Sequence, residues 1–187
     1  PMLKDVFGAE RRKAKTLNFS IAYGKTAFGL AKDWGVSLQE AKDTVDLWFS
    51  DRPEVLRWQD DIKATARKQK CTRTLMGRYR PLPGIMHRER ARRSHFERAA
   101  INTPIQGGAA DIVIMAMLKI HSNERLRELG YRLLLQIHDE VIIEGPEEHV
   151  DEAMRILRDC MEHPFENPLK VDLVVDAKAA RTWYDAK

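Results

Sequence analysis

The part of the sequence that most constrains the fold is the stretch from Tyr131 to Gly145, which reads YRLLLQIHDEVIIEG. Two short apolar runs flank three polar residues, His138, Asp139 and Glu140. Each run has the length of a buried strand, and β-branched residues dominate the second run. Because three residues are too few for a crossover between parallel strands, the stretch predicts an antiparallel hairpin.

The tip of this hairpin carries two adjacent carboxylates, Asp139 and Glu140. Neighbouring carboxylates repel each other unless a cation lies between or near them, and a divalent metal ion is the simplest such cation. Asp is also a common turn residue, so a solvated turn explains the same sequence. From this stretch alone, the metal site and the solvated turn are equally open.

Length and composition restrict the class of protein. The chain has 187 residues, 43% of them hydrophobic and 32% charged, which is typical of one globular domain, or one and a fraction. The sequence contains no apolar run of membrane-spanning length, so we expect no membrane partner. Its two cysteines form no metal-ligand spacing and no disulfide framework, which favours a reducing, intracellular compartment.

Charge is unevenly distributed along the chain. Residues 61–100 contain 12 Lys and Arg against 3 Asp and Glu, whereas residues 140–176 contain 11 acids against 3 bases. A basic middle next to an acidic C-terminal part indicates a polyanionic partner on one side. The alternative is a pair of solvated helical faces.

Residues 8 to about 23 predict a helix that contains no internal Gly or Pro and ends before Gly24. Cations in its first half suit phosphates, and rings in its second half suit stacking on a sugar or base. The alternative is that the rings belong to the core and the cations extend past them to solvent. Four residues spaced by four share nearly one face of this helix: Arg11, Lys15, Phe19 and Tyr23.

Further helices are predicted at Ser37, which opens a capping box with Glu40, and at Pro53. Residues 71–83 predict a small hairpin that turns at Met76-Gly77, with Arg73, Arg78 and Arg80 alternating along it. A helix that contains Arg98 and Asn102 on a shared face bends or restarts at Pro104, before Gln106. Arg, Asn and Gln are donors that read nucleic-acid edges or sugars.

The C-terminal part continues with a helix from Gly107 to about Leu129, the central hairpin, an amphipathic helix from Pro146 to Met161 and a final strand from Leu169 to Val175. The order of these elements favours an antiparallel sheet with helices on one face. We therefore predict the α+β class.

Four blocks of the sequence, in this order, resemble family A DNA polymerases of the bacterial polymerase I type. Arg11-x3-Lys15-x3-Phe19-x3-Tyr23-Gly24 resembles motif B of that family, and His138-Asp139-Glu140 resembles its motif C. Two intervening blocks also match: Thr74-Leu75-x-Gly77-Arg78, and the segment from Arg98 to Gly107, RAAINTPIQG. The resemblance covers nearly the whole chain, and within the family the segment KDVFGAERRKAKTLNFSIAYGKT is similar to the plant and protist organellar branch.

This resemblance implies a right-hand polymerase fold. Residues 1–83 would form mostly helical fingers, with the motif B helix at about 8–23. Residues 84–187 would form the C-terminal portion of an antiparallel-sheet palm, with the motif C hairpin at about 131–145. The activity implied is template-directed addition of dNTPs to the 3′ end of a primer by two-metal phosphoryl transfer.

Site residues follow from the same resemblance. Arg11 and Lys15 would hold the triphosphate of the dNTP, and Lys15 would also protonate the leaving pyrophosphate. Phe19 would pack on the sugar and Tyr23 would lie at the nascent base pair. Asp139, with Glu140 nearby, would bind the catalytic Mg²⁺ ions. Primer-template DNA would contact the remaining motif residues: Arg78, Arg98, Asn102, Gln106 and His138.

The motif A aspartate of the family is absent from the sequence, as is a thumb. We therefore expect the second Asp ligand for Mg²⁺ to come from an upstream segment or from a partner subunit that carries motif A and the thumb. The compartment would be a plastid, a mitochondrion or the bacterial cytoplasm. Two alternatives are a fragment of a single-subunit phage-type RNA polymerase and a non-catalytic DNA-binding relic of a polymerase.

Overall fold

The computed structural model describes residues 6–186, which divide into one compact unit that ends at Gly107 and a second that begins at Gly108. The described residues are mostly helical and contain two antiparallel sheets of two strands each. The predicted α+β class is therefore confirmed.

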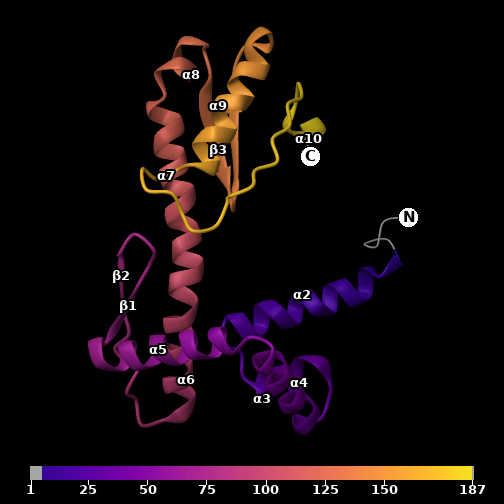
Figure 1. The fold of residues 1–187 in the computed structure, drawn as a ribbon, viewed down its shortest axis with the longest axis vertical. Coiled ribbons are helices and arrows are strands. Elements are labelled where there is room, and N and C mark those ends of the chain that lie inside the picture. The colour runs from indigo at the N-terminus through magenta and orange to yellow at the C-terminus, as the bar shows by residue number, and fades with distance from the viewer. Residues whose placement is uncertain (1–5, 187) are drawn as a thin grey trace. The chain divides into compact units, whose positions relative to one another are not determined.

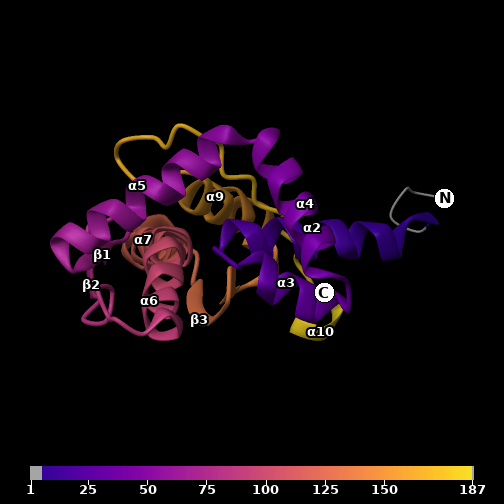
Figure 2. The same ribbon diagram turned by 90° about the horizontal axis from the view of Figure 1, so that it is seen from below.

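The first unit is built from helices and one small hairpin (Figures 1 and 2). Ser37 starts α4 as predicted, because its hydroxyl oxygen accepts a hydrogen bond from the Glu40 backbone N–H at 3.1 Å. Pro53 starts α5, where the missing N–H has no cost. The elements are α2 (Gly8–Ala22), α3 (Ala27–Trp34), α4 (Leu38–Ser50), α5 (Pro53–Gln69), β1 (Cys71–Arg73), β2 (Tyr79–Pro81), α6 (Arg90–Asn102) and the π-helix η1 (Thr103–Gly107).

Two apolar clusters hold the first unit together. The first joins the end of α2 to α3 and α4 through Ile21, Leu30 and Ala41, which are fully buried. The second is centred on Ala66 of α5 and Ala100 of α6 and includes the residues that link β2 to α6. Most of the N-terminal part of α2 is exposed, so the burial that fixes this helix is concentrated at its C-terminal end.

The second unit places two helices against the central hairpin (Figure 1). A cluster around Ile120, Leu126, Ala153 and Cys160 forms its core, and Val141 packs against that cluster from the hairpin. The elements are α7 (Gly108–Ser122), α8 (Glu124–Glu128), β3 (Arg132–Ile137), β4 (Glu140–Glu144), the 3₁₀ turn η2 (Glu147–His149), α9 (Val150–Glu162) and α10 (Trp183–Ala186).

The central hairpin forms as predicted, with β3 and β4 antiparallel. Its strands are less buried than the apolar runs predicted, because only one face packs on the helices. Leu134 and Leu135 are about half exposed, and the pairing register shifts at this point. Ile137 pairs with Glu140, which leaves His138 and Asp139 as a turn of two residues.

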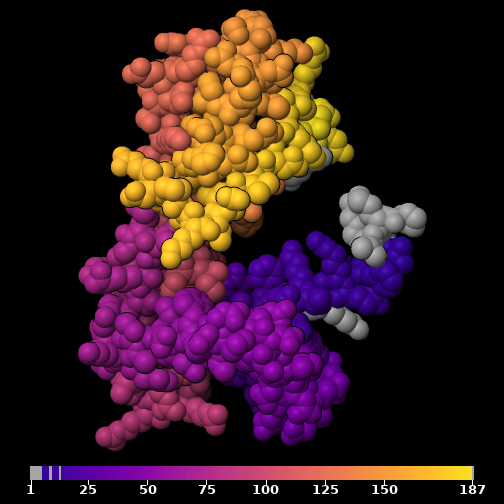
Figure 3. Space-filling view, in the orientation of Figure 1, coloured from indigo at the N-terminus to yellow at the C-terminus, as the bar shows by residue number. Residues whose placement is uncertain are grey.

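Two predictions for the second unit are wrong in detail. The predicted helix from Gly107 to about Leu129 is divided, because the Asn123 side chain caps a separate helix, α8, by accepting from the Leu126 N–H at 2.9 Å. The predicted strand from Leu169 to Val175 does not form. The backbone N–H of Val175 donates to the Glu162 carboxylate instead of to a strand, and the segment runs over the surface of the unit (Figure 3).

One helical run among the described residues, Arg90–Ser122, is long and apolar enough to cross a membrane, judged by length and composition only. The core helix of a soluble protein passes the same test. In the second unit this run consists of α7, which packs against α9 and β3 and contains the buried Asp111. These contacts bury part of its apolar surface, whereas Ile114 and Leu118 remain about half exposed.

A test of the hairpin turn concerns His138, whose φ is +55°, a left-handed conformation that costs a side chain with a Cβ roughly 1–3 kcal/mol. We expect His138→Gly to be more stable than His138→Ala by about 1 kcal/mol, because only glycine relieves the strain. Urea unfolding of the two variants measures the difference. An alanine variant as stable as the glycine variant would contradict this account of the turn.

A test of the first unit's core is Leu30→Ala. Leu30 is 0% exposed, and we expect its truncation to lower the free energy of unfolding by about 2–5 kcal/mol through lost burial and the cavity left behind. The matched control is Leu47→Ala, because Leu47 is 67% exposed and its truncation should change the stability by less than about 0.5 kcal/mol. Equal losses in the two variants would show that the core is placed wrongly.

Candidate nucleotide and nucleic-acid interface

The stripe predicted on the first helix exists on α2 as a run of stacked groups. The Lys15 Nζ lies 5.6 Å from the centroid of the Phe19 ring. The Phe19 and Tyr23 rings stack, with centroids 5.9 Å apart and planes inclined by 16°. Arg11 and Lys15 are exposed, and Phe19 is 48% exposed, so the alternative that Phe19 belongs to the core does not hold.

This arrangement gives α2 one continuous face with two chemical halves. The ammonium of Lys15 is attracted to the ring face beneath it, which keeps the positive charge next to the aromatic surface. A ligand that fits the face has a negative group at one end and a flat or apolar group at the other. A nucleoside triphosphate has this pattern.

The C-terminal end of α2 lies against α6. Gly24 has a φ of +77°, and a Cβ at this position would lie 2.8 Å from the Ile101 Cδ1 and 3.7 Å from the Arg98 Cγ. Only glycine therefore permits both the turn and the approach. As a result, Tyr23 is placed close to the residue that begins the second predicted strip, Arg98.

The second strip consists of Arg98 and Asn102 on α6 and Gln106 on η1. The Asn102 amide donates to the Gln106 side-chain oxygen at 2.9 Å. The sequence predicts a shared face for Arg98 and Asn102 only, because Pro104 removes a helical hydrogen bond. The structure accommodates Pro104 in a π-helix instead of a break, so Asn102 and Gln106 also come together.

The small hairpin packs on this π-helix. Its turn runs from Thr74 to Gly77, whose N–H donates to the Thr74 carbonyl at 3.0 Å. Arg78 donates to the Gly107 carbonyl at 3.2 Å, and Arg80 donates to the Thr103 hydroxyl oxygen at 3.2 Å. The structure thus gives the Arg78 side chain a contact inside the first unit, which the motif match did not reveal.

In the second unit, His138, Asp139 and Glu140 are all exposed at the tip of the hairpin. The Gln136 side chain donates to the His138 carbonyl, which supports the turn from beneath. The other end of the hairpin is closed by Tyr131, whose hydroxyl donates to the Pro146 carbonyl at 2.8 Å. Burial raises the pKa of Tyr131, so this hydroxyl stays protonated and donates at neutral pH.

The tip supplies the donor chemistry of a magnesium site but only part of a ligand set. Carboxylate oxygens are the ligands that Mg²⁺ prefers. No group of three or more His, Cys, Asp or Glu side chains in residues 6–186 is arranged to hold a metal ion. Asp139 and Glu140 are exposed carboxylates at this tip, and within the described residues no third side chain of these types completes a metal-binding group with them.

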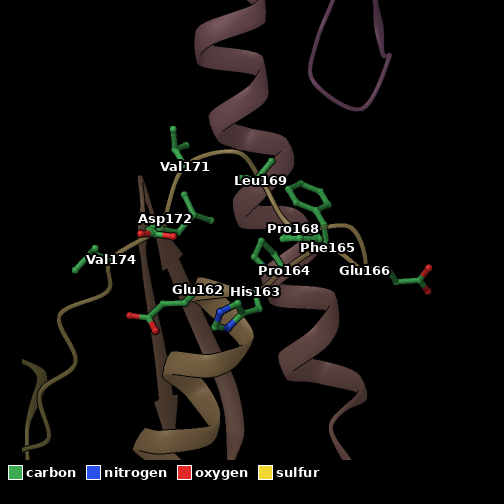
Figure 4. A pocket seen from close by; sticks show the side chains of 11 residues that line it. Glu162, His163, Pro164, Phe165, Glu166, Pro168, Leu169, Val171, Asp172 and Val174 are labelled. Carbon is green, nitrogen blue, oxygen red and sulfur yellow. The ribbon is translucent and has the colours of Figure 1, made fainter.

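A hollow elsewhere in the second unit contains none of the predicted site residues. It has a volume of about 450 Å³ and lies where the chain leaves α9, between His163, Phe165 and Leu169 (Figure 4). The predicted residues instead lie mostly on open surfaces, with Asn102 and Tyr23 half-buried. An open surface suits a large ligand, whereas a small ligand is usually bound in an enclosed pocket.

Comparisons with known proteins agree with the motifs. The chain is similar to DNA polymerase I B, mitochondrial, of Oryza sativa subsp. japonica, at 58% identity over the whole chain and 18% of the relative. It is also similar to DNA polymerase I of Geobacillus stearothermophilus, at 41% identity over 98% of the chain and 21% of the relative. The chain thus spans about a fifth of the length of these relatives.

A solved structure has the same fold. It is described as the POL domain of Pol1 from M. smegmatis in complex with DNA primer-template and dNTP, and it matches 94% of this chain and 31% of its own with a TM-score of 0.86 and 36% identity. These matches are all to DNA polymerases, so they do not favour the alternative of a phage-type RNA polymerase. The family model for DNA polymerase family A matches residues 2–185, and the chain belongs to that family.

Proposed function

We propose that this chain is the C-terminal portion of a template-directed DNA polymerase, which adds dNTPs to the 3′ end of a primer. The observation that carries the proposal is the exposed face of α2, where Lys15, Phe19 and Tyr23 stack in a row that ends beside Arg98. A cationic half followed by an aromatic half matches the phosphates and the base of a nucleoside triphosphate. The match to DNA polymerase family A indicates the reaction in which such a ligand would be used.

In this proposal Arg11 and Lys15 hold the triphosphate, and Lys15 protonates the leaving pyrophosphate. Phe19 packs on the sugar and Tyr23 contacts the nascent base pair. Both cations are exposed, so a ligand in solvent can reach them. Phosphoryl transfer needs positioning and neutralisation of charge more than covalent chemistry, and these are the contributions that cations and rings make.

The primer-template duplex lies along the strip of Arg98, Asn102 and Gln106, with Arg78 and His138 as further contacts. The hydrogen bond from the Asn102 amide nitrogen to the Gln106 side-chain oxygen holds the two side chains in one orientation, and each amide nitrogen retains at least one N–H donor for the duplex. The relative described in complex with DNA primer-template and dNTP supports both ligands for this chain.

The metal of the proposed reaction is Mg²⁺, held by Asp139 with Glu140 nearby. When bound, two such ions polarise the attacking 3′ hydroxyl and stabilise the leaving oxygens. The hairpin fixes Asp139 in a turn of two residues, which limits where its carboxylate can point. The second Asp ligand comes from a polymerase segment or subunit that carries motif A and the thumb.

The rival candidate is a non-catalytic relic that binds DNA. A relic needs a basic surface but not a carboxylate at the tip of a strained turn, which the chain retains at Asp139 beside the positive φ of His138. For the compartment, we propose an organelle or the bacterial cytoplasm. The identity of 58% to a mitochondrial plant relative, against 41% to a bacterial one, favours the organelle.

The first test is primer extension by a polymerase that joins this chain to the upstream segment of the family. We expect Asp139→Asn to lower kcat by more than about 100-fold, because it removes a metal ligand worth several kcal/mol in the transition state. The control is Asp176→Asn, since Asp176 is also an exposed acid of the second unit but lies outside the motif. Normal synthesis by the Asp139 variant would favour the relic.

The same primer-extension assay can be applied to the isolated 187-residue chain. Because Asp139 and Glu140 supply only part of a ligand set, we expect the isolated chain not to extend a primer in the presence of Mg²⁺ and dNTPs. Extension by the isolated chain would refute the proposed need for motif A from elsewhere.

The nucleotide face is tested by two adjacent arginines. Arg11 and Arg12 are both exposed, but only Arg11 belongs to the stripe on α2. In the same joined polymerase we expect Arg11→Met to raise the KM for dNTP by about tenfold, the equivalent of one charge-assisted hydrogen bond, and Arg12→Met to raise it less than twofold. Steady-state kinetics on one primer-template measure both values. Equal effects would show general charge attraction instead of a defined triphosphate site.

A further inference from the structure

Gln59 is a buried polar residue that the motifs do not include. It lies on α5 and is 3% exposed. Its Nε2 donates to the backbone carbonyl of Ile21 at 2.8 Å and to that of Ala22 at 3.3 Å. Because carbonyl oxygens only accept, the nitrogen of the amide and not its oxygen must face them. Burial of an amide is unfavourable unless such bonds form, so the side chain is held in this orientation.

The two carbonyls belong to the last residues of α2. The final carbonyls of a helix have no partner within the helix and are often served by a basic side chain of the last turn, which α2 lacks. The Ile21 carbonyl also accepts from the Gly24 N–H at 2.9 Å, so Gln59 joins the bond that shapes the turn after the helix. The turn itself is capped within the chain by Gly24 and by the Lys25 N–H, which donates to the Ser20 carbonyl at 2.8 Å, and a neighbouring helix adds a second donor to the Ile21 carbonyl and also reaches the Ala22 carbonyl.

This end of α2 is fixed from several sides, whereas the other end is not. Trp48 of α4 donates to the Asn18 side chain at 2.7 Å, and Ile101 of α6 closely approaches Gly24. In contrast, Arg11 and Lys15 lie on a part of the helix that is exposed. α2 is thus anchored at its C-terminal end, next to Tyr23. The hydrogen bonds from Gln59 are the buried polar part of this anchor.

We propose that Gln59 is a positioning residue for the incoming nucleotide: its amide fixes the C-terminal end of α2 and thereby the orientation of the stacked Phe19 and Tyr23 rings. This inference rests on the proposed function, in which those rings contact the sugar and the nascent base pair. Gln59 itself does not touch the nucleotide. It acts through the two carbonyls and the turn that follows them.

The first test compares variants of the joined polymerase described above. Gln59→Met keeps a similar volume but removes the donor, and we expect it to raise the KM for dNTP by about tenfold while kcat changes less than twofold. A loss of folded protein would lower kcat and leave KM unchanged. The control is Gln69→Met, an exposed position on the same helix, which should change neither value. An unchanged KM in Gln59→Met would overturn the inference.

A second variant separates the hydrogen bond from simple packing. Gln59→Lys retains an N–H donor that can reach the carbonyls and also complements the helix dipole, so we expect its KM for dNTP to lie closer to that of the wild type than the KM of Gln59→Met does. A role in packing alone predicts the opposite order, because a buried charge is worse than a buried thioether. A Met variant that is better folded and binds dNTP more tightly than the Lys variant would therefore contradict the proposal.

Hydrogen exchange in the 187-residue chain tests the anchor without any activity. The N–H groups of Gly24 and Lys25 donate to the Ile21 and Ser20 carbonyls, at 2.9 and 2.8 Å. We expect them to exchange about tenfold faster in Gln59→Met and at the wild-type rate in Gln69→Met. If the wild-type polymerase fails to extend primers, the proposed function fails, while unchanged exchange in Gln59→Met would refute the anchor itself.

Discussion

The close approach of Gly24 to Ile101 is the contact on which the first unit's candidate site depends. It requires a residue without a Cβ at a positive φ, and it brings the end of α2 against α6, the helix that carries Arg98 and Asn102. Any side chain at this position would be strained by the positive φ, and its Cβ would also require the buried Ile101 side chain to shift. Phe19 and Tyr23 are four residues apart, so their stacking follows from α2 itself, and the contact at Gly24 places the end of that helix beside Arg98.

Around this contact, the C-terminal end of α2 is fixed by burial, whereas the N-terminal end of the same helix is open to solvent. The apolar cluster of Ile21, Leu30 and Ala41 supplies burial at the fixed end, and Gln59 supplies the polar bonds there. The other end carries Arg11 and Lys15, which are exposed to solvent.

The second unit holds two adjacent acids, Asp139 and Glu140, at the exposed tip of its hairpin. The helices α7 and α9 cover one face of the hairpin and leave its turn outside the core. Exposure reduces the repulsion between Asp139 and Glu140, since water screens the charges. The turn is nevertheless defined, because pairing of Ile137 with Glu140 leaves only two residues to reverse the chain, and one of them, His138, accepts a left-handed conformation.

The sequence by itself determined the α+β class, the central hairpin, the starts of α4 and α5 at Ser37 and Pro53, and the family. These features rest on local signals, such as alternation of apolar residues, capping side chains and the missing N–H of proline, which act within a few residues of the chain. Only the tertiary structure decided that η1 accommodates Pro104, that the segment from Leu169 to Val175 pairs with no strand in the described residues, and that Gln59 donates to the last carbonyls of α2. The reason is that each of these depends on a partner distant in the sequence: a strand forms only where another backbone accepts its hydrogen bonds, and Gln59 reaches two carbonyls nearly forty residues away.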